Sequence, residues 1–185
     1  MIIIGITGTI GAGKGTIVDF LTGKGFVHYS VRAFITEELN RRGIAVNRDN
    51  MVVVANEMRA KNSPSFIIEQ LYLQASESNQ NCIIESIRTI GEVEQLRKFE
   101  NFCLFAVDAN PELRYQRIKG RNSETDQISY DVFIENEKRE MTSDDMNKQN
   151  LSKCISMADY IIENNGTIDE LNVKVEKILN DFRIK

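Results

Sequence analysis

The residues with the most specific chemistry form a glycine-rich run near the N-terminus, Gly8-Thr9-Ile10-Gly11-Ala12-Gly13-Lys14-Gly15-Thr16. The run follows the apolar stretch 2–6, so it is expected to lie between a strand and a helix. At such a junction glycines admit positive φ values, and the helix N-terminus points several backbone N–H groups at one place. Lys14 could then reach the terminal phosphates of a polyphosphate, and Thr16 could offer a hydroxyl near a metal ion. The pattern predicts a phosphate-binding loop, and the alternative is a glycine-rich turn with a solvated lysine.

An acid and a base follow the predicted third strand. Glu85 and Arg88 stand three residues apart, directly after the apolar residues 82–84. Glu85 can hold Mg²⁺, directly or through water, because that ion prefers oxygen ligands. Arg88 can form a forked contact with a phosphate. A surface ion pair at a strand end is the alternative interpretation.

A basic stripe is expected further along the chain. Arg114, Arg117 and Arg121 share one face of the helix that starts after residue 110. On an otherwise acidic protein such a stripe repels itself unless an anion lies against it, and a triphosphate would be a suitable anion. The polar residues that follow predict a lid over residues 120–128. A solvated helix face is the alternative.

Strand-like and helical patterns alternate along the whole chain. The strands are expected at 2–7, 26–29, 82–86, 102–107 and 159–163. This alternation predicts one α/β domain over residues 1–185, with a five-stranded, mainly parallel sheet. In such a sheet ligands bind beyond the carboxyl ends of the strands, which is where the residues above fall. Helices between residues 30 and 77 form a long insertion between the second and third strands.

Short motifs specify three helix starts. Ser63-Pro64 and Asn110-Pro111 are typical of an N-cap followed by proline at the first helical position. Residues Thr167–Glu170 have the form of a capping box. The helix behind this box is expected to bury one apolar face, formed by Ile168, Leu171, Val175, Ile178, Leu179 and Phe182.

The composition excludes several classes of partner. The 185 residues carry a net charge of −4 and a pI near 5.2, which does not favour nucleic acid polymers or anionic membranes. No stretch reaches the ~20 apolar residues of a spanning helix and no secretory signal is recognisable, so a cytoplasmic protein is expected. Cys82, Cys103 and Cys154 lack metal or redox spacing and are expected to be buried thiols. The sequence does not determine the oligomeric state, and it is compatible with a monomer.

The motifs resemble those of nucleoside monophosphate kinases. Gly15 stands where most nucleotide hydrolases carry Ser or Thr, and the resulting G-K-G-T resembles the P-loop of adenylate kinase. Residues 116–121 resemble the E-R-I-x-G-R segment that opens the adenylate kinase lid. Residues 85–88 are similar to D-G-F-P-R of those enzymes and closer to D-G-I-R of archaeal adenylate-kinase-related proteins. Residues 158–167 resemble the A-D-x-V-I-x-N-x-G-[ST] ending of dephospho-CoA kinases and of those archaeal relatives.

This resemblance implies the three-layer P-loop NTPase fold, a central five-stranded parallel sheet with helices on both faces, and Mg-ATP as the phosphoryl donor. It implies that the transferring group is stabilised by Lys14, Arg88, Arg117 and Arg121. The donor would be held by the loop 8–16 with Arg117, Asn165 and Gly166, and the metal by Thr16 and Glu85. The insertion 30–77 would form the acceptor site, and the residues expected to bind the acceptor are Ser30, Arg32, Arg59, Arg88 and Arg139.

One departure from the adenylate kinase pattern concerns the acceptor. Adenylate kinases have an arginine where this chain has Thr36, so Arg32 or Arg59 would have to serve in its place. Residues 28–32 contain no acid, whereas dephospho-CoA kinases carry an aspartate there that suits a hydroxyl acceptor. The leading hypothesis is therefore a nucleoside or deoxynucleoside monophosphate kinase. The alternatives are a kinase for a hydroxyl acceptor, of the dephospho-CoA kinase type, and a non-catalytic ATP-sensing module.

Overall fold

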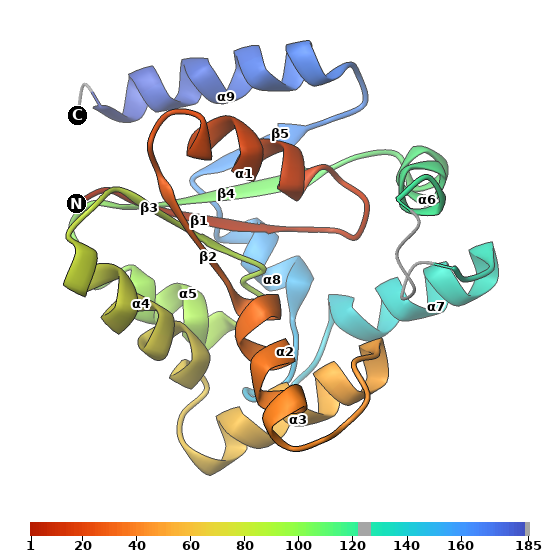
Figure 1. Cartoon of the computed structure of the whole chain (residues 1–185). Coiled ribbons are helices and arrows are strands. Elements are labelled where there is room, and N and C mark those ends of the chain that lie inside the picture. Colours follow the sequence, from red (N-terminus) through yellow and green to blue (C-terminus); the bar gives the residue numbers. More distant parts are fainter. Residues whose placement is uncertain (122–126, 184–185) are drawn as a thin grey trace.

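The structure is a computed structural model that describes residues 1–121 and 127–183. Five parallel strands form one sheet in the order β2-β3-β1-β4-β5 (Figure 1). Their bounds are Ile3–Gly8 for β1, Val27–Ser30 for β2, Cys82–Glu85 for β3, Phe102–Asp108 for β4 and Tyr160–Glu163 for β5. Each strand lies within about one residue of its expected bounds, and the predicted parallel sheet is confirmed.

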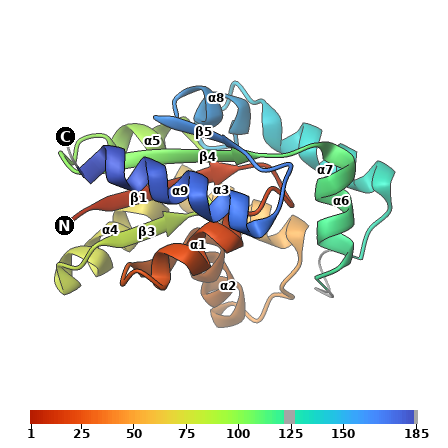
Figure 2. The same ribbon diagram turned by 90° about the horizontal axis from the view of Figure 1, so that it is seen from above.

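Helices cover both faces of the sheet and extend beyond its carboxyl edge. Their bounds are Lys14–Thr22 for α1, Val31–Arg41 for α2, Arg48–Lys61 for α3, Phe66–Ser78 for α4, Ile90–Leu96 for α5, Pro111–Lys119 for α6, Tyr130–Met141 for α7, Leu151–Ser156 for α8 and Ile168–Arg183 for α9. Helices α1 and α9 lie on one face, and α4, α5 and α8 lie on the other (Figures 1 and 2). Helices α6 and α7 lie beyond the strand ends, and α2 packs on α3.

Each face of the sheet buries its own apolar core, because side chains alternate along a strand. Ile4 and Ile6 of β1 pack with Leu21 of α1 and Val175 of α9. Ile3 packs into the second core, under α2 to α5 and α8. All six residues of β1 are buried. The loop that leaves its carboxyl end therefore starts from a rigid support.

Two predicted helix starts are confirmed. Pro111 lies in the first turn of α6, and the Asn110 side chain accepts a hydrogen bond from Glu112 N at 3.2 Å. At α9 the capping box forms: Glu170 N donates to Thr167 Oγ1 (3.2 Å) and Thr167 N donates to Glu170 Oε2 (2.9 Å). These caps hold two loops that border the site described below.

Two local predictions are wrong. Helix α4 begins at Phe66 rather than at Pro64, because residues 63–66 close a turn in which Phe66 N donates to Ser63 O at 3.0 Å. Ile168 is 64% exposed and lies outside the buried face of α9. It is the first residue of that helix and borders a small cavity instead.

Other expectations concern the cysteines, the lid and the membrane. The three cysteines are buried. The predicted lid includes residues 122–126, which lie outside the described residues. No helix within 1–121 and 127–183 has both the length and the apolar character needed to cross a membrane.

Candidate active site

The glycine-rich loop connects β1 to α1, as predicted, and Gly8, Gly11 and Gly13 leave no room for a side chain. Gly8 has a φ of 138°, and a Cβ there would lie 2.1 Å from the carbonyl oxygen of Val107. Gly13 has a φ of 108°, and a Cβ there would lie 2.3 Å from Asn164 Nδ2. The loop is thus packed between β4 and the segment after β5. Its backbone N–H groups gather at the N-terminus of α1, where phosphate binds in such loops.

Asn164 holds the loop in place, whereas the resemblance implied only that residues 164–166 border the nucleotide. Its side chain is buried, and its Nδ2 donates to the carbonyl oxygen of Ala12 at 2.8 Å. Asn164 is the asparagine of the motif at 158–167. It ties the segment after β5 to the P-loop.

Arg114 does not belong to the predicted exposed stripe. It is 2% exposed, donates from Nη1 to the carbonyl oxygen of Ile10 (3.2 Å) and pairs through Nη2 with Glu137 of α7 (2.8 Å). Its charge is paired inside the protein, and its hydrogen bond to Ile10 stabilises the P-loop. Arg117 and Arg121 of the stripe border the two cavities described below.

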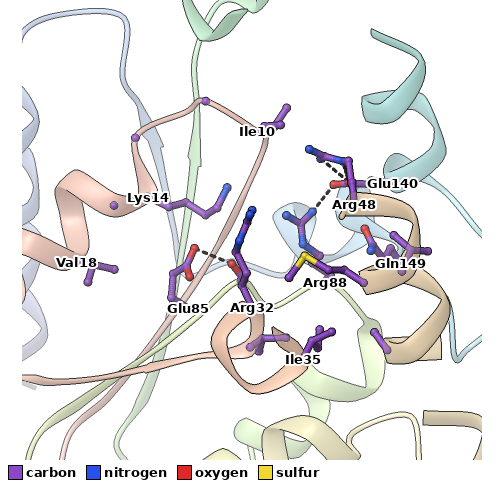
Figure 3. A pocket seen from close by; sticks show the side chains of 18 of the residues that line it. Ile10, Lys14, Val18, Arg32, Ile35, Arg48, Glu85, Arg88, Glu140 and Gln149 are labelled. Carbon is purple, nitrogen blue, oxygen red and sulfur yellow. Dashed lines mark hydrogen bonds and ion pairs between the residues drawn. The ribbon is translucent and has the colours of Figure 1, made fainter. Parts of the chain in front are cut away.

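Lys14, the P-loop lysine and first residue of α1, points toward the main cavity (Figure 3). Its Nζ donates to the carbonyl oxygens of Gly8 (2.9 Å) and Thr9 (2.8 Å). Burial, and then the Arg88 guanidinium, lower the pKa of Lys14 from its ordinary 10.5 to about 8. Anionic oxygens placed beside the ammonium group would oppose this shift, because they favour its charged form.

The main cavity has a volume of about 540 Å³ and lies between the P-loop, the end of β3 and helices α2, α3 and α7 (Figure 3). Six cationic residues line it: Lys14, Arg32, Arg48, Arg59, Arg88 and Arg121. Three acids line it as well: Asp19, Glu85 and Glu140. Helices α2 and α3 add an apolar wall made of Val31, Ile35, Met51, Val52 and Ala55. This lining suits a ligand with an anionic group at one end and an apolar or planar group at the other.

Glu85, the last residue of β3, borders the cavity. Its carboxylate accepts hydrogen bonds from Ser86 Oγ (2.7 Å) and Ser30 Oγ (3.4 Å). Ser86 has a φ of 74°, which residues other than glycine rarely adopt and which structures often retain at functional sites. The D-G-I-R motif has glycine at this position, which was the sequence signal for the unusual backbone.

Glu85 and Thr16, which line the same cavity, fit a magnesium ion. Among the described residues, no three His, Cys, Asp or Glu side chains gather into a group that could hold a metal. Mg²⁺ does not need such a group, because it keeps several waters and binds through one or two protein oxygens together with substrate phosphates. A carboxylate and a hydroxyl beside a P-loop match this donor set.

Glu140 of α7 joins Arg88 to Arg48, the first residue of α3. Arg88 Nη1 donates to Glu140 Oε2, and Arg48 donates to Oε1 from Nε (3.1 Å) and from Nη2 (2.6 Å). Burial alone would raise the pKa of Glu140, but the Arg88 and Arg48 guanidinium groups hold that pKa below its ordinary value. Sequence reasoning missed Arg48 and Glu140, because no motif spacing connects two residues 92 positions apart.

A second cavity, of about 210 Å³, lies beside the P-loop near the segment after β5. Arg117 lines it and donates to the carbonyl oxygens of Asn164 (2.9 Å) and Gly166 (3.4 Å). Burial, and then Arg121, lower the pKa of Arg117. Arg121 and Thr16 line both cavities, so they lie where the two meet.

Two sequence comparisons identify relatives of this chain. A profile of the AAA domain family matches residues 4–143. A UPF0200 protein of Pyrobaculum aerophilum is 30% identical over 184 residues, which cover 98% of each chain. This chain belongs to the UPF0200 family, with an AAA domain.

Solved structures share the fold of this UPF0200 protein. Shikimate kinase from Bacteroides thetaiotaomicron matches with a TM-score of 0.60 at 14% identity, over 97% of this chain and 98% of that chain. Dephospho-CoA kinase from Campylobacter jejuni matches with a TM-score of 0.51 at 16% identity, over 97% and 96% of the two chains. At such identities the likeness establishes the fold, and the predicted three-layer P-loop kinase fold is confirmed.

Arg59 has a different setting from the one expected of an acceptor ligand. It lines the main cavity, but its side chain is 1% exposed and pairs with buried Glu92 at 2.7 Å. Glu92 also accepts hydrogen bonds from the backbone N–H groups of Arg88 (2.8 Å) and Thr89 (3.1 Å). The pair therefore supports the segment that carries Arg88.

Three further expected site residues lie apart from the cavity linings. Arg139 is exposed and pairs with Asp49 at 2.9 Å, and it is not among the residues that line the main cavity. Ser30 caps α2 by accepting from Ala33 N at 3.2 Å. Asn165 Oδ1 accepts from Asn110 N at 2.7 Å, so this side chain joins two loops and does not line the second cavity. Arg32, in contrast, points into the main cavity as expected (Figure 3).

Proposed function

We propose that this protein transfers the terminal phosphoryl group of Mg-ATP to a small acceptor that already carries a phosphate, most readily a nucleoside or deoxynucleoside monophosphate. One observation carries the proposal: a single 540 Å³ cavity joins Lys14 of the P-loop to Arg88 and Arg48 and ends on an apolar wall. Phosphoryl transfer requires little covalent chemistry from a protein. It requires that donor and acceptor be positioned and that developing charge be compensated.

On the donor side, the P-loop N–H groups and Lys14 bind the phosphates, and the second cavity takes the adenosine part. Arg117 and the segment Asn164–Gly166 form its border. Arg121, which lines both cavities, compensates charge on the group in transit. Bound Mg²⁺ would be held by Thr16 and Glu85 and would neutralise charge on the phosphates.

On the acceptor side, Arg88 and Arg32 bind the phosphate, and the apolar wall from α2 and α3 packs against the base. An arginine fork matches a phosphate in both charge and geometry. A phosphate acceptor is already ionised at neutral pH and needs no general base. The absence of an acid in residues 28–32 is in keeping with such an acceptor.

A hydroxyl acceptor is the second candidate, and the position of Glu85 favours it. The Glu85 carboxylate borders the main cavity and could accept the proton of a hydroxyl group. Two proteins of the same fold are named shikimate kinase and dephospho-CoA kinase. A protein that only senses ATP is a third possibility, but binding alone would not call for six cationic residues around one cavity.

The test is an ATP-consumption assay with a panel of acceptors: nucleoside monophosphates, deoxynucleoside monophosphates, dephospho-CoA and shikimate. We expect transfer to a monophosphate, and we expect Arg88→Lys to raise the KM for that acceptor and lower kcat while the KM for ATP moves less. Lysine keeps the charge of Arg88 but loses its fork.

Two outcomes would redirect the assignment. Efficient transfer to dephospho-CoA or shikimate, without transfer to any monophosphate, would favour a kinase that phosphorylates a hydroxyl group. ATP binding without consumption in the presence of any acceptor would favour the sensing module.

A further inference from the structure

Glu140 occupies the place between two arginines that come from distant parts of the chain. Arg48 opens α3, Arg88 follows β3, and Glu140 lies in the last turn of α7. Figure 3 shows both guanidinium groups directed at the one carboxylate. Each carboxylate oxygen is taken by a different arginine, Oε1 by Arg48 and Oε2 by Arg88. Two arginines thus converge on a spot the size of one anion.

Without these two contacts, the position of Glu140 would be unfavourable for a negatively charged side chain. It lies near the C-terminus of α7, where the helix dipole repels negative charge, and its side chain is only 5% exposed. A buried carboxylate needs charged partners, and Arg48 and Arg88 are the partners the structure gives it. Both arginine side chains keep an exposed fraction of 19%, so a ligand in the cavity can reach them.

We propose that Glu140 stands in for the acceptor's phosphate on Arg48 and Arg88, and that acceptor binding requires the phosphate to displace it. Glu140 is then a specificity-determining residue. Arg48 is the second arginine of the acceptor site, beside Arg88. This inference rests on the proposed function, in that it concerns the acceptor end of the same cavity.

Charge decides which ligands can make this exchange. A phosphate monoester carries nearly two negative charges at neutral pH, so it neutralises the two arginines more completely than one carboxylate does. A neutral hydroxyl group offers no charge in return for Glu140, and two guanidinium groups would be left without a partner. The exchange therefore admits phosphorylated acceptors and rejects neutral ones.

The test must separate this exchange from the opposite role, in which Glu140 is a permanent brace that positions Arg48 and Arg88 around the ligand. The two roles differ in the sign of one measurement. If Glu140 competes with the phosphate, its removal strengthens phosphate binding. If it is a brace, its removal weakens phosphate binding.

The experiment measures inorganic phosphate binding by calorimetry, with the P-loop saturated by Mg²⁺ and a non-hydrolysable ATP analogue. We expect Glu140→Gln to bind phosphate roughly tenfold more tightly than the unchanged protein, since it releases charge-assisted hydrogen bonds for the ligand. We expect Arg48→Met to bind phosphate more weakly, and the double variant to lose most of the gain.

Asp49→Asn provides the matched control. Asp49 and Arg139 also connect α3 to α7, at 2.9 Å, but they do so on the surface and outside the cavity lining. Loss of this bridge should leave phosphate affinity unchanged. An equal effect of Asp49→Asn and Glu140→Gln would show that only the packing of the two helices matters and would overturn the proposal.

Unchanged or weaker phosphate binding by folded Glu140→Gln also overturns it, as does the failure of both proteins to bind phosphate. If Glu140→Gln does not fold, Glu140→Asp tests the same sign, because the shorter carboxylate cannot span both arginines. The proposed function is judged separately by the transfer assay. Tighter phosphate binding by Glu140→Gln without transfer to any acceptor would support the exchange and reject the kinase assignment alone.

Discussion

Lys14 combines a cationic group with a position that disfavours its charge. Its contacts are the carbonyl oxygens of Gly8 and Thr9, which belong to the loop itself, so its removal should leave the fold intact. We predict that Lys14→Ala lowers kcat by about 10²-fold or more, the scale of losing one preorganised electrostatic contact. Steady-state kinetics measures this loss, with circular dichroism as the control for folding. An unchanged kcat would remove Lys14 from the proposed mechanism.

The lowered pKa of Lys14 predicts a pH dependence of ATP binding. Phosphate oxygens favour the ammonium form, so ATP raises the pKa of Lys14 from about 8 toward its ordinary 10.5. Affinity should therefore fall as the pH rises above about 8. At pH 8, in the absence of divalent metal, binding should take up about half a proton per ATP.

Calorimetry in buffers with different ionisation enthalpies measures this proton uptake. Lys14→Ala is the matched control, and its affinity should vary less across the same pH range. Equal pH profiles for the two proteins would assign the dependence to another group.

At the scale of elements, Arg114 links three parts of the fold: it lies on α6, supports the P-loop through Ile10 and pairs with Glu137 on α7. Removing one partner of a buried ion pair leaves the others without compensation. We predict that Arg114→Met lowers the free energy of unfolding by about 3 kcal/mol, measured by denaturant titration.

Arg41→Met is the control for this prediction. The Arg41 side chain is 72% exposed and pairs with Glu38 on the surface of α2. Exposed pairs of this kind contribute little to stability because water screens them, so this variant should unfold almost as the unchanged protein does. Equal losses in the two variants would mean that Arg114 has no special role in holding α6 and α7 to the P-loop.

The end of α6 carries a second prediction. Arg121, which follows α6 and its C-cap Gly120, lines both cavities, so a ligand in either one would lie beside it. We predict that Arg121→Ala lowers kcat more than it weakens ATP binding, because the residue is fully engaged only when donor and acceptor are both bound. Lys119→Ala, at the last residue of α6 and outside both cavity linings, should change neither constant. A fall in ATP affinity at constant kcat would make Arg121 a ground-state anchor.

At the scale of the whole molecule, the two cavities meet at the carboxyl edge of a sheet whose faces are both covered. A ligand that binds only the folded state stabilises it by mass action. We predict that an ATP analogue at about 100 times its Kd adds about 2.7 kcal/mol, or roughly 5 to 10 °C in Tm for a chain of this size. A monophosphate should add a further shift, and the matching unphosphorylated nucleoside should add none. Equal shifts from both would contradict recognition through phosphate.

Local patterns in the sequence determined the elements and the P-loop of this protein. Strands β1, β3 and β4 are short apolar runs, and the loop after β1 is specified by closely spaced glycines and Lys14, so neighbours along the chain carry this information. The capping box at α9 and the proline at α6 are local for the same reason. The start of α4 was predicted wrongly, because residues 63–66 form a turn in place of the first helical turn.

Only the tertiary structure decided how the charged residues are used. Arg114 and Arg59 have the same side chain as Arg88, yet folding buries the first two against Glu137 and Glu92. Arg48 and Glu140 meet although 92 positions separate them, and no spacing in the sequence encodes that contact. An ion pair forms wherever two elements bring opposite charges within a few ångströms, and this depends on how whole helices pack, which a linear pattern does not record.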